Sequence, residues 1–125
     1  MNAQLFARAA YGRPETPIRS YRQIEYDLFA KITQKMTQAN QVRETDFPFF
    51  MAALHENLRL WRTIATDVSS PENGLPEQLR AKLYYLYQFT DQHSRKVAKR
   101  EAAIEVLIDI NTAIMRGLRG EGDRP

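Results

Sequence analysis

Along residues 47–69, FPFFMAALHENLRLWRTIATDVS, apolar side chains recur at alternating spacings of four and three. The stripe consists of Phe50, Leu54, Trp61, Ile64 and Val68, with the polar residue Asn57 at the one remaining position. A repeat of about 3.5 residues is typical of a helix packed lengthwise against other helices. This helix would be about 30 Å long, the width of a small domain. We therefore expect the rest of the chain to pack around it.

A first long helix is predicted to begin at Ser20, which forms a capping-box pattern with Gln23. We expect this helix to end near Asn40, inside the polar run 37–46. Its apolar stripe consists of Tyr21, Ile24, Leu28, Phe29, Ile32 and Met36. Pro48 falls in the first turn of the following helix, where proline is tolerated.

The sequence SSPENGLP at residues 69–76 is the clearest break in the chain, because it combines two prolines with an Asn-Gly pair. Pro76 followed by Glu77 is a helix-start signal, so a third helix is predicted from there. We expect its buried stripe to consist of Leu79, Leu83, Leu86, His93 and Val97.

The boundary before the last helix, within KVAKREAAIEVLIDI, contains neither Gly nor Pro. One helix over residues 76–117 would be too long for this domain, so we place a turn at Lys99–Ala102. The last helix is predicted to stop at Gly117 or Gly120. Its stripe consists of Ile104, Leu107, Ile108, Asn111, Ile114, Met115 and Leu118.

Residues 3–11, AQLFARAAY, favour a short helix. It would need a partner surface, because an isolated helix of this length is marginal in water. Pro14 and Pro17 predict a non-helical connection after it, and residues 121–125 are expected to form a disordered tail. No strand-like alternation and no internal repeat stands out. The predicted fold is all-α: a single-domain helical bundle over residues 1–120, with four longer helices plus a short N-terminal helix.

The chain has 125 residues, of which 43% are hydrophobic, enough to form one domain with a substantial core. It contains no cysteine, which excludes disulfides and thiolate metal sites and fits a cytoplasmic protein. We expect no signal peptide, since no basic segment precedes a long apolar run. We also expect no membrane span, since no window approaches 18 consecutive apolar residues.

The net charge of +3 is mild and well mixed, so nucleic-acid binding is not expected from it. Basic residues cluster only at Arg95, Lys96, Lys99 and Arg100. We interpret this cluster as a solvated helix end whose cations complement the helix dipole.

The sequence offers little for catalysis or metal binding. The histidines are His55 and His93, and neither belongs to an HExxH pattern. The phosphate-binding motifs GxxxxGK[ST] and GxGxxG and the nucleophile motif GxSxG do not occur. Glu105 and Asp109 lie four residues apart, which is more typical of a solvated helix face than of an acid–base pair. We predict no enzyme activity, metal or cofactor, and interpret His93 as a hydrogen-bonded core residue.

Asn57 and Asn111 each lie on an apolar stripe, where an unpaired amide would cost about 1–3 kcal/mol. They could bond each other or the linker 73–76 and so fix the helix register, or form a polar anchor at the edge of a partner groove. Four aromatic residues within 84–89 occupy more than one helix face. Some of them must be exposed, or covered by the N-terminal segment or a partner, which indicates a protein-binding surface.

The stretches HENLRLWRTIATDVSSPENGLPEQLRAKL, from His55, and LIDINTAIMRGLRG, from Leu107, resemble the FlaF family, small proteins needed for flagellum biogenesis in alphaproteobacteria. The segments ARAAY, PIR and EYDLFAKIT are similar to the same family, so the resemblance runs from about Ala7 to Gly120. Its specific elements are an N-x-R-L-W block, an Asp six residues later, an Asn-Gly-Leu-Pro linker and an I-D-I-N-x-x-I-M block. Family members often carry a glycine between the last two helices, where this chain has Lys-Arg-Glu-Ala.

The resemblance implies a flagellin-dedicated factor. FlaF proteins are linked to flagellin production and export, and are thought to bind flagellin before secretion as a chaperone. They work alongside the regulator FlbT, which acts on flagellin messenger RNA. A helical bundle with surplus aromatic surface can bind a flagellin helix in a groove. We expect this groove to be lined or supported by Asn57, Leu60, Trp61, Leu75, Tyr84, Tyr87, Ile110, Asn111 and Met115.

Two other functions stay open. The first is an RNA-binding regulator of flagellin translation that uses the basic cluster at residues 95–100, whose binding would collapse as salt rises. The second is a structural adaptor that docks to the export machinery rather than to flagellin.

Overall fold

The computed structural model describes residues 18–118 and 120, with side chains described from Glu25 onward. This part of the chain forms four helices and no strand: α2 (Ile18–Gln41), α3 (Phe47–Val68), α4 (Glu77–Ala98) and α5 (Glu105–Leu118). The prediction of an all-α bundle with four longer helices is confirmed. The predicted short helix over residues 3–11 and the tail over residues 121–125 lie outside the described residues.

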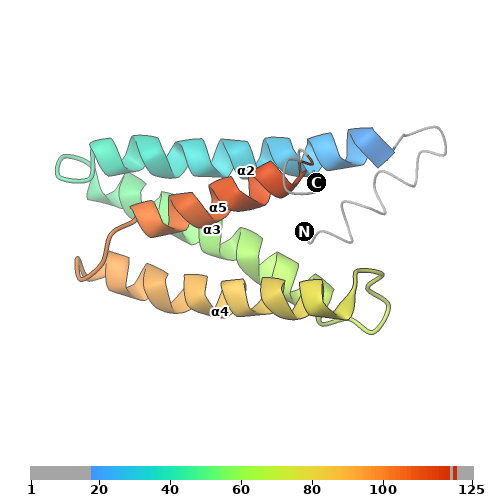
Figure 1. The fold of residues 1–125 in the computed structure, drawn as a ribbon. Helices are drawn as coiled ribbons and strands as arrows, with labels where there is room; N and C mark the ends of the chain where they lie inside the picture. The colour runs from blue at the N-terminus through green and yellow to red at the C-terminus, as the bar shows by residue number, and fades with distance from the viewer. Residues whose placement is uncertain (1–17, 119, 121–125) are drawn as a thin grey trace.

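Successive helices run antiparallel to one another around the bundle (Figure 1). α2 packs against both α3 and α5, and α3 packs closely against α4, whereas α4 and α5 contact each other least among the neighbouring pairs. Figure 1 shows α4 and α5 diverging from their connecting turn, with α5 following α2. The helices therefore pack closely on three sides of the bundle and least closely between α4 and α5.

The boundaries of α2 and α3 follow from local residue chemistry. The Asp46 carboxylate caps α3 by accepting a hydrogen bond from the Phe49 N–H at 3.1 Å, and Pro48 occupies the first turn as predicted. The described part of α2 already includes Ser20 as its third residue, so the prediction that Ser20 caps this helix is wrong. Its last residue, Gln41, lies next to the predicted stop.

The turn between α4 and α5 lies where it was predicted, although it contains no glycine. Arg100 adopts a φ of 63°, in the left-handed region. The Arg100 N–H donates to the Val97 carbonyl at 3.0 Å, and the Glu101 N–H donates to the Lys96 carbonyl at 2.8 Å. This is the Schellman pattern of hydrogen bonds, in which glycine usually takes the left-handed position. Arginine takes that position here.

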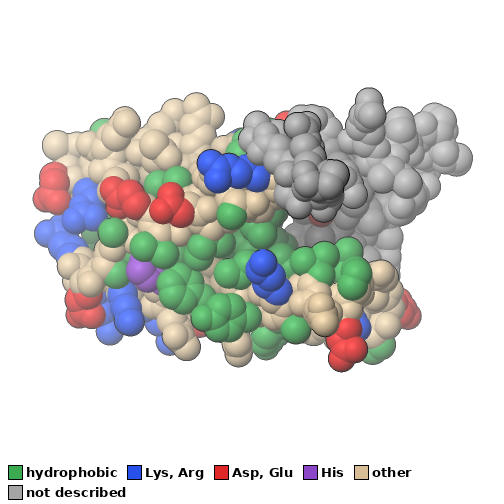
Figure 2. All heavy atoms as spheres, viewed as in Figure 1, with side chains coloured by type: hydrophobic (Ala, Val, Ile, Leu, Met, Phe, Trp, Pro, Cys, Tyr) green, Lys and Arg blue, Asp and Glu red, His purple; other side chains and the backbone are tan. Residues whose placement is uncertain are grey.

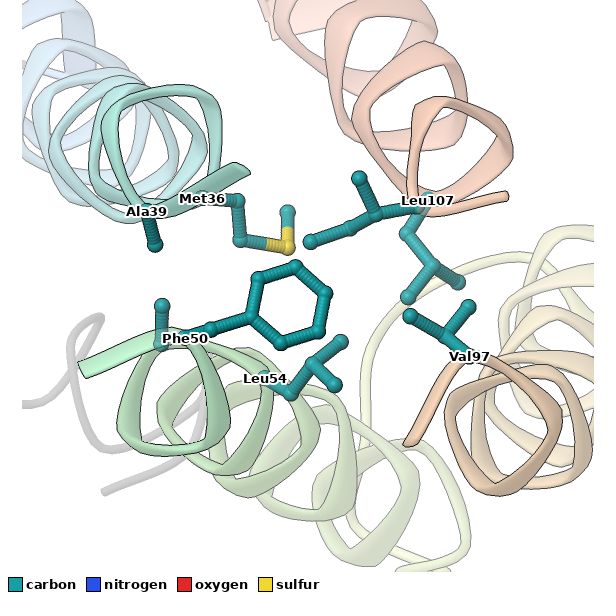
Figure 3. Close-up of a cluster of buried hydrophobic side chains, with 8 residues drawn as sticks. Met36, Ala39, Phe50, Leu54, Val97 and Leu107 are labelled. Carbon is teal, nitrogen blue, oxygen red and sulfur yellow. The ribbon is translucent and has the colours of Figure 1, made fainter. Parts of the chain in front are cut away.

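Two buried clusters form the core. The first lies near the α4–α5 turn and joins all four helices through Met36, Ala39, Phe50, Ala53, Leu54, Val97, Ile104 and Leu107 (Figure 3). The second surrounds Trp61 and contains Phe29, Ile32, Leu60, Ile64 and Val68. The predicted stripe of α3 is confirmed, because each of its members, including Asn57, is buried.

The predicted stripe of α4 is only partly correct. Val97 is buried, but Leu79 is 40% exposed and Leu83, Leu86 and His93 are half-buried. The buried residues in the middle of α4 are Thr90 and Ser94, whose small side chains allow a close approach to α3. The leucines stay partly uncovered because α5 diverges from α4 and follows α2.

The left-handed position predicts a difference between two substitutions of Arg100. Both Arg100→Gly and Arg100→Ala remove the guanidinium that lies 5.3 Å from the centre of the Phe47 ring. Only glycine adopts positive φ without a steric penalty, so we expect Arg100→Gly to be more stable than Arg100→Ala by about 1 kcal/mol. Urea unfolding followed by circular dichroism measures this difference. Equal stability of the two variants would show that the backbone conformation at residue 100 is not strained.

Candidate protein-binding site

A buried hydrogen-bond network holds α5 against α2 and α3. Asn111 on α5 donates from Nδ2 to Asn57 Oδ1 at 2.8 Å and to Thr33 Oγ1 at 3.1 Å. Its Oδ1 accepts from Trp61 Nε1 at 3.0 Å. Asn57, Trp61 and Asn111 are fully buried, so each hydrogen bond lies away from water. The prediction that the two asparagines bond each other is confirmed.

This network spans the diagonal of the bundle. α3 and α5 are not packing neighbours, yet two side chains of α3 meet Asn111 in the centre. The three partners of Asn111 come from two different helices, so one rotation of α5 allows all three hydrogen bonds to form together. Buried polar groups that are paired in this way specify the helix register. Any other register leaves them unpaired, and each unpaired group costs about 1–3 kcal/mol of stability.

Two hydrogen bonds define which flanks of α4 and α5 face each other. His93 Nε2 lies 2.8 Å from the Ala103 carbonyl oxygen at the start of α5, so the flank of α4 that carries His93 faces α5. Asn40 Nδ2 donates to Glu105 Oε2 at 3.3 Å, so the flank of α5 that carries Glu105 faces α2. From the helical period of 3.6 residues, Leu86 and Phe89 share the flank of His93.

The same helical period places Ile110 and Ile114 on the flank of α5 opposite Glu105, toward α4. The facing flanks thus present one apolar surface, which we call the α4–α5 face: Leu79, Leu83, Leu86, Phe89, Ile110, Ile114 and Leu118. Leu79 is exposed and the other six are half-buried. Figure 2 shows hydrophobic side chains gathered over α4 and toward α5 on this side of the molecule.

The residues predicted to line or support a groove fall into three groups. Asn57, Leu60, Trp61 and Asn111 are buried beneath the surface and can only support it. Ile110 and Met115 both pack on the Trp61 cluster, and the helical period places Ile110 on the flank of α5 toward α4 and Met115 nearer α2. The remaining three, Leu75, Tyr84 and Tyr87, belong to the linker and to another flank of α4.

The two tyrosines form a pair of their own. Their ring centroids are 5.7 Å apart, and Tyr87 packs on the Trp61 cluster while Tyr84 is 40% exposed. The helical period places this pair about 100–160° around α4 from Leu86 and Phe89. Tyr87 and Ile110 nevertheless both pack against the Trp61 cluster, whereas Tyr84 lies further around α4.

The residues of the α4–α5 face that sequence reasoning missed were mostly assigned to the core. Leu79, Leu83 and Leu86 have the spacing of a buried stripe, and nothing in that spacing reports that α5 leaves α4 uncovered. The available signal was the polar pair Thr90 and Ser94 between Leu86 and Val97. Small polar residues at the centre of a stripe indicate that the helix packs against its neighbour at that level. The leucines at other levels of the helix are then less covered.

Two of the four residues in the basic cluster at the end of α4 make local contacts. Arg95 Nη2 donates to Asp91 Oδ2 at 3.1 Å, and the Arg100 guanidinium lies over the Phe47 ring. Arg95 and Lys96 occupy the last turn of the helix, where cations complement the helix dipole. Among the side chains that the structure describes, no three from His, Asp or Glu converge in a way that could hold a metal ion.

His93 is half-buried and is hydrogen-bonded to the α4–α5 turn, with its ring stacked on Phe89 at 5.3 Å. It therefore has the structural role that was predicted for it, at the edge of the core instead of its centre. Among the described residues, no helix combines the length and the apolarity needed to cross a bilayer.

The comparison with known families decides the identity. The family model described as flagellar protein FlaF matches residues 7–118. The chain belongs to the FlaF family. It is therefore a flagellar protein, and the match covers all four described helices and the linkers between them. No curated protein and no solved structure matches this FlaF chain.

The Asn111 network predicts that replacing Asn111 by an apolar residue of similar volume strongly lowers the free energy of unfolding. Asn111→Leu leaves Asn57 Oδ1 and Trp61 Nε1 buried without partners, so we expect a loss of about 2–4 kcal/mol in the free energy of unfolding. Adding Asn57→Leu should cost less in the Asn111→Leu background than in the wild type, because the unpaired amide is then removed. Urea unfolding measures the four stabilities of this cycle.

The matched control is Asn40→Leu, which removes the solvent-exposed hydrogen bond to Glu105 between the same two helices, α2 and α5. We expect this change to alter stability by no more than about 0.5 kcal/mol. A cost for Asn111→Leu as small as that of Asn40→Leu would contradict the assignment of the network as the determinant of the α5 position.

Proposed function

We propose that this FlaF chain binds flagellin in the cytoplasm as a secretion chaperone, and that the α4–α5 face is the surface that it uses. The carrying observation is the set of seven apolar side chains that α5 leaves partly uncovered by following α2 instead of α4. The chain acts in this proposal as a binding protein and not as an enzyme.

The shape of this surface suits one kind of ligand. α4 and α5 diverge from their connecting turn (Figure 1), and the partly covered side chains are aliphatic or aromatic along more than two turns of each helix. An amphipathic helix bound between two helices places apolar residues in such a strip at i, i+3, i+4 and i+7. A flagellin segment that would otherwise self-associate is a ligand of this kind, and covering it before export supports both its supply and its secretion.

The alternative of direct RNA binding has weaker support. Of the four cations at residues 95–100, one is paired with Asp91 and one lies over Phe47, and Glu101 and Glu105 follow within five residues. RNA binding would show a steep loss of affinity with salt, because counterion release dominates phosphate contacts. Binding through the α4–α5 face would depend on apolar area and respond weakly to salt.

Titration of purified flagellin with two double variants tests the location of the site. Leu79→Ser/Leu86→Ser removes apolar groups from the α4–α5 face, and Tyr84→Ser/Tyr87→Ser removes the tyrosine pair from the other flank of the same helix. We expect the leucine variant to bind flagellin about tenfold more weakly or worse, which corresponds to about 1.4 kcal/mol. The tyrosine variant should bind within about threefold of the wild type.

Circular dichroism and urea unfolding of each variant separate lost binding from lost folding. A folded tyrosine variant that loses flagellin, beside a leucine variant that retains it, would move the site to the flank of Tyr84 and Tyr87. Wild-type protein that binds no flagellin at micromolar concentration but retains flagellin messenger RNA would replace the chaperone proposal with the RNA-binding one.

A further inference from the structure

One charged side chain belongs to the row of α4 residues that borders the α4–α5 face. The residues four, seven and eleven positions after Lys82 are Leu86, Phe89 and His93. The helical period places all four on one flank of the helix. The hydrogen bond from His93 to the start of α5 shows that this flank faces α5, and Lys82 on it is exposed. Figure 2 shows a basic side chain among the hydrophobic ones on this side of the molecule.

Lys82 has no carboxylate partner among the described residues, whose ion pairs are made by other side chains. Both acidic residues of α4 lie away from its flank, since Asp91 is on the opposite side of the helix and Glu77 is about 140° away. On α5, Glu105 faces α2, and Asp109 follows it by four residues on the same side of the helix. Lys82 is therefore an unpaired cation within the border of an apolar surface.

The flank of α5 across the face carries no charge. The residues three, four and seven positions after Ile110 are Ala113, Ile114 and Gly117, and they share its flank. Ala113 and Gly117 are exposed, and their small size allows close approach of another helix. A helix that binds between α4 and α5 thus meets a positive charge on its α4 side and an uncharged surface on its α5 side.

We infer that the partner helix carries acidic residues on the flank that faces α4, and that Lys82 selects this helix by pairing with one of them. The inference rests on the proposed function, because it takes the α4–α5 face as the binding surface. It adds the chemical class of the ligand, an amphipathic helix with an apolar strip and an acidic flank. The apolar strip supplies most of the affinity, and the ion pair determines which way round the helix binds.

A lysine at an apolar surface can instead have only a solvating role, with its stem against the surface and its ammonium group in water. The two roles have opposite effects on binding. A partner without carboxylates removes water from the ammonium group and returns nothing, so Lys82 weakens its binding. A partner with a carboxylate opposite Lys82 replaces the lost water by an ion pair, so Lys82 strengthens its binding.

Two designed peptides test the inference without flagellin. Both are amphipathic helices of about 14 residues with leucines at i, i+3, i+4 and i+7. One carries glutamates on the flank beside the leucines, and the other carries lysines at the same positions. Fluorescence anisotropy of the labelled peptides with the full-length protein measures both affinities. We expect the wild type to bind the glutamate peptide about tenfold more tightly, because Lys82 attracts one peptide and repels the other.

Three variants show whether Lys82 causes this preference. Lys82→Glu should reverse it, and Lys82→Met should bind the two peptides within about threefold of each other. The matched control is Lys31→Glu, which makes the same change of net charge at an exposed position of α2. It should keep the wild-type preference within about twofold, since charges far from the site are screened by salt. Leu79→Ser/Leu86→Ser should lose both peptides, which locates them on the α4–α5 face.

Equal affinity of the wild type for the two peptides would overturn the inference, as would failure of both to bind. Equal shifts for Lys82→Glu and Lys31→Glu would also overturn it. Titration of flagellin with the same variants separates the inference from the proposed function. Flagellin binding that Lys82→Glu leaves unchanged would overturn the inference and retain the chaperone function. A Lys82-dependent preference for the glutamate peptide, combined with no flagellin binding, would support the inference about the ligand and reject the chaperone function.

Discussion

The hydrogen bonds that Asn111 makes with Asn57, Trp61 and Thr33 determine where α5 lies in this bundle. Apolar residues alone would allow α5 to rotate or slide, because packing that depends on burial tolerates several arrangements. A buried amide with three specific partners tolerates few, since each alternative leaves polar groups unpaired. The network thus decides that α5 follows α2 and meets the side chains of α3 on the diagonal.

The open side of the bundle follows from that choice. Because α5 packs along α2, α4 is held mainly by its contact with α3. Thr90 and Ser94 allow close packing in this contact. The apolar flank of α4 that would complete a symmetric four-helix bundle is then only partly covered. The fixed polar centre and the partly uncovered apolar surface are two results of one arrangement. Under the proposed function, the FlaF chain offers this surface to its partner without any movement of its core.

The sequence predicts the helices well because their signals are local. The stripe of α3, the break at residues 69–76 and the turn near Arg100 all depend on neighbours in the chain. The proposed binding surface, the α4–α5 face, is harder to predict, because it depends on the distance between α4 and α5, which no local signal in the chain reports. The leucines of α4 have the same spacing whether or not another helix covers them. Asn57 and Asn111 could be identified as partners, but the sequence does not show that their contact positions α5 against α2.

The most direct test of this account is amide hydrogen exchange of the full-length chain with and without flagellin. We predict that flagellin slows exchange in residues 79–89 of α4 and 110–118 of α5, on the two sides of the α4–α5 face. Exchange around Arg59 and Thr63, which line a hollow between α2 and α3, should stay unchanged. Protection confined to α2 and α3, or protection only of the basic cluster at residues 95–100, would contradict the claim that the opening between α4 and α5 is the binding site.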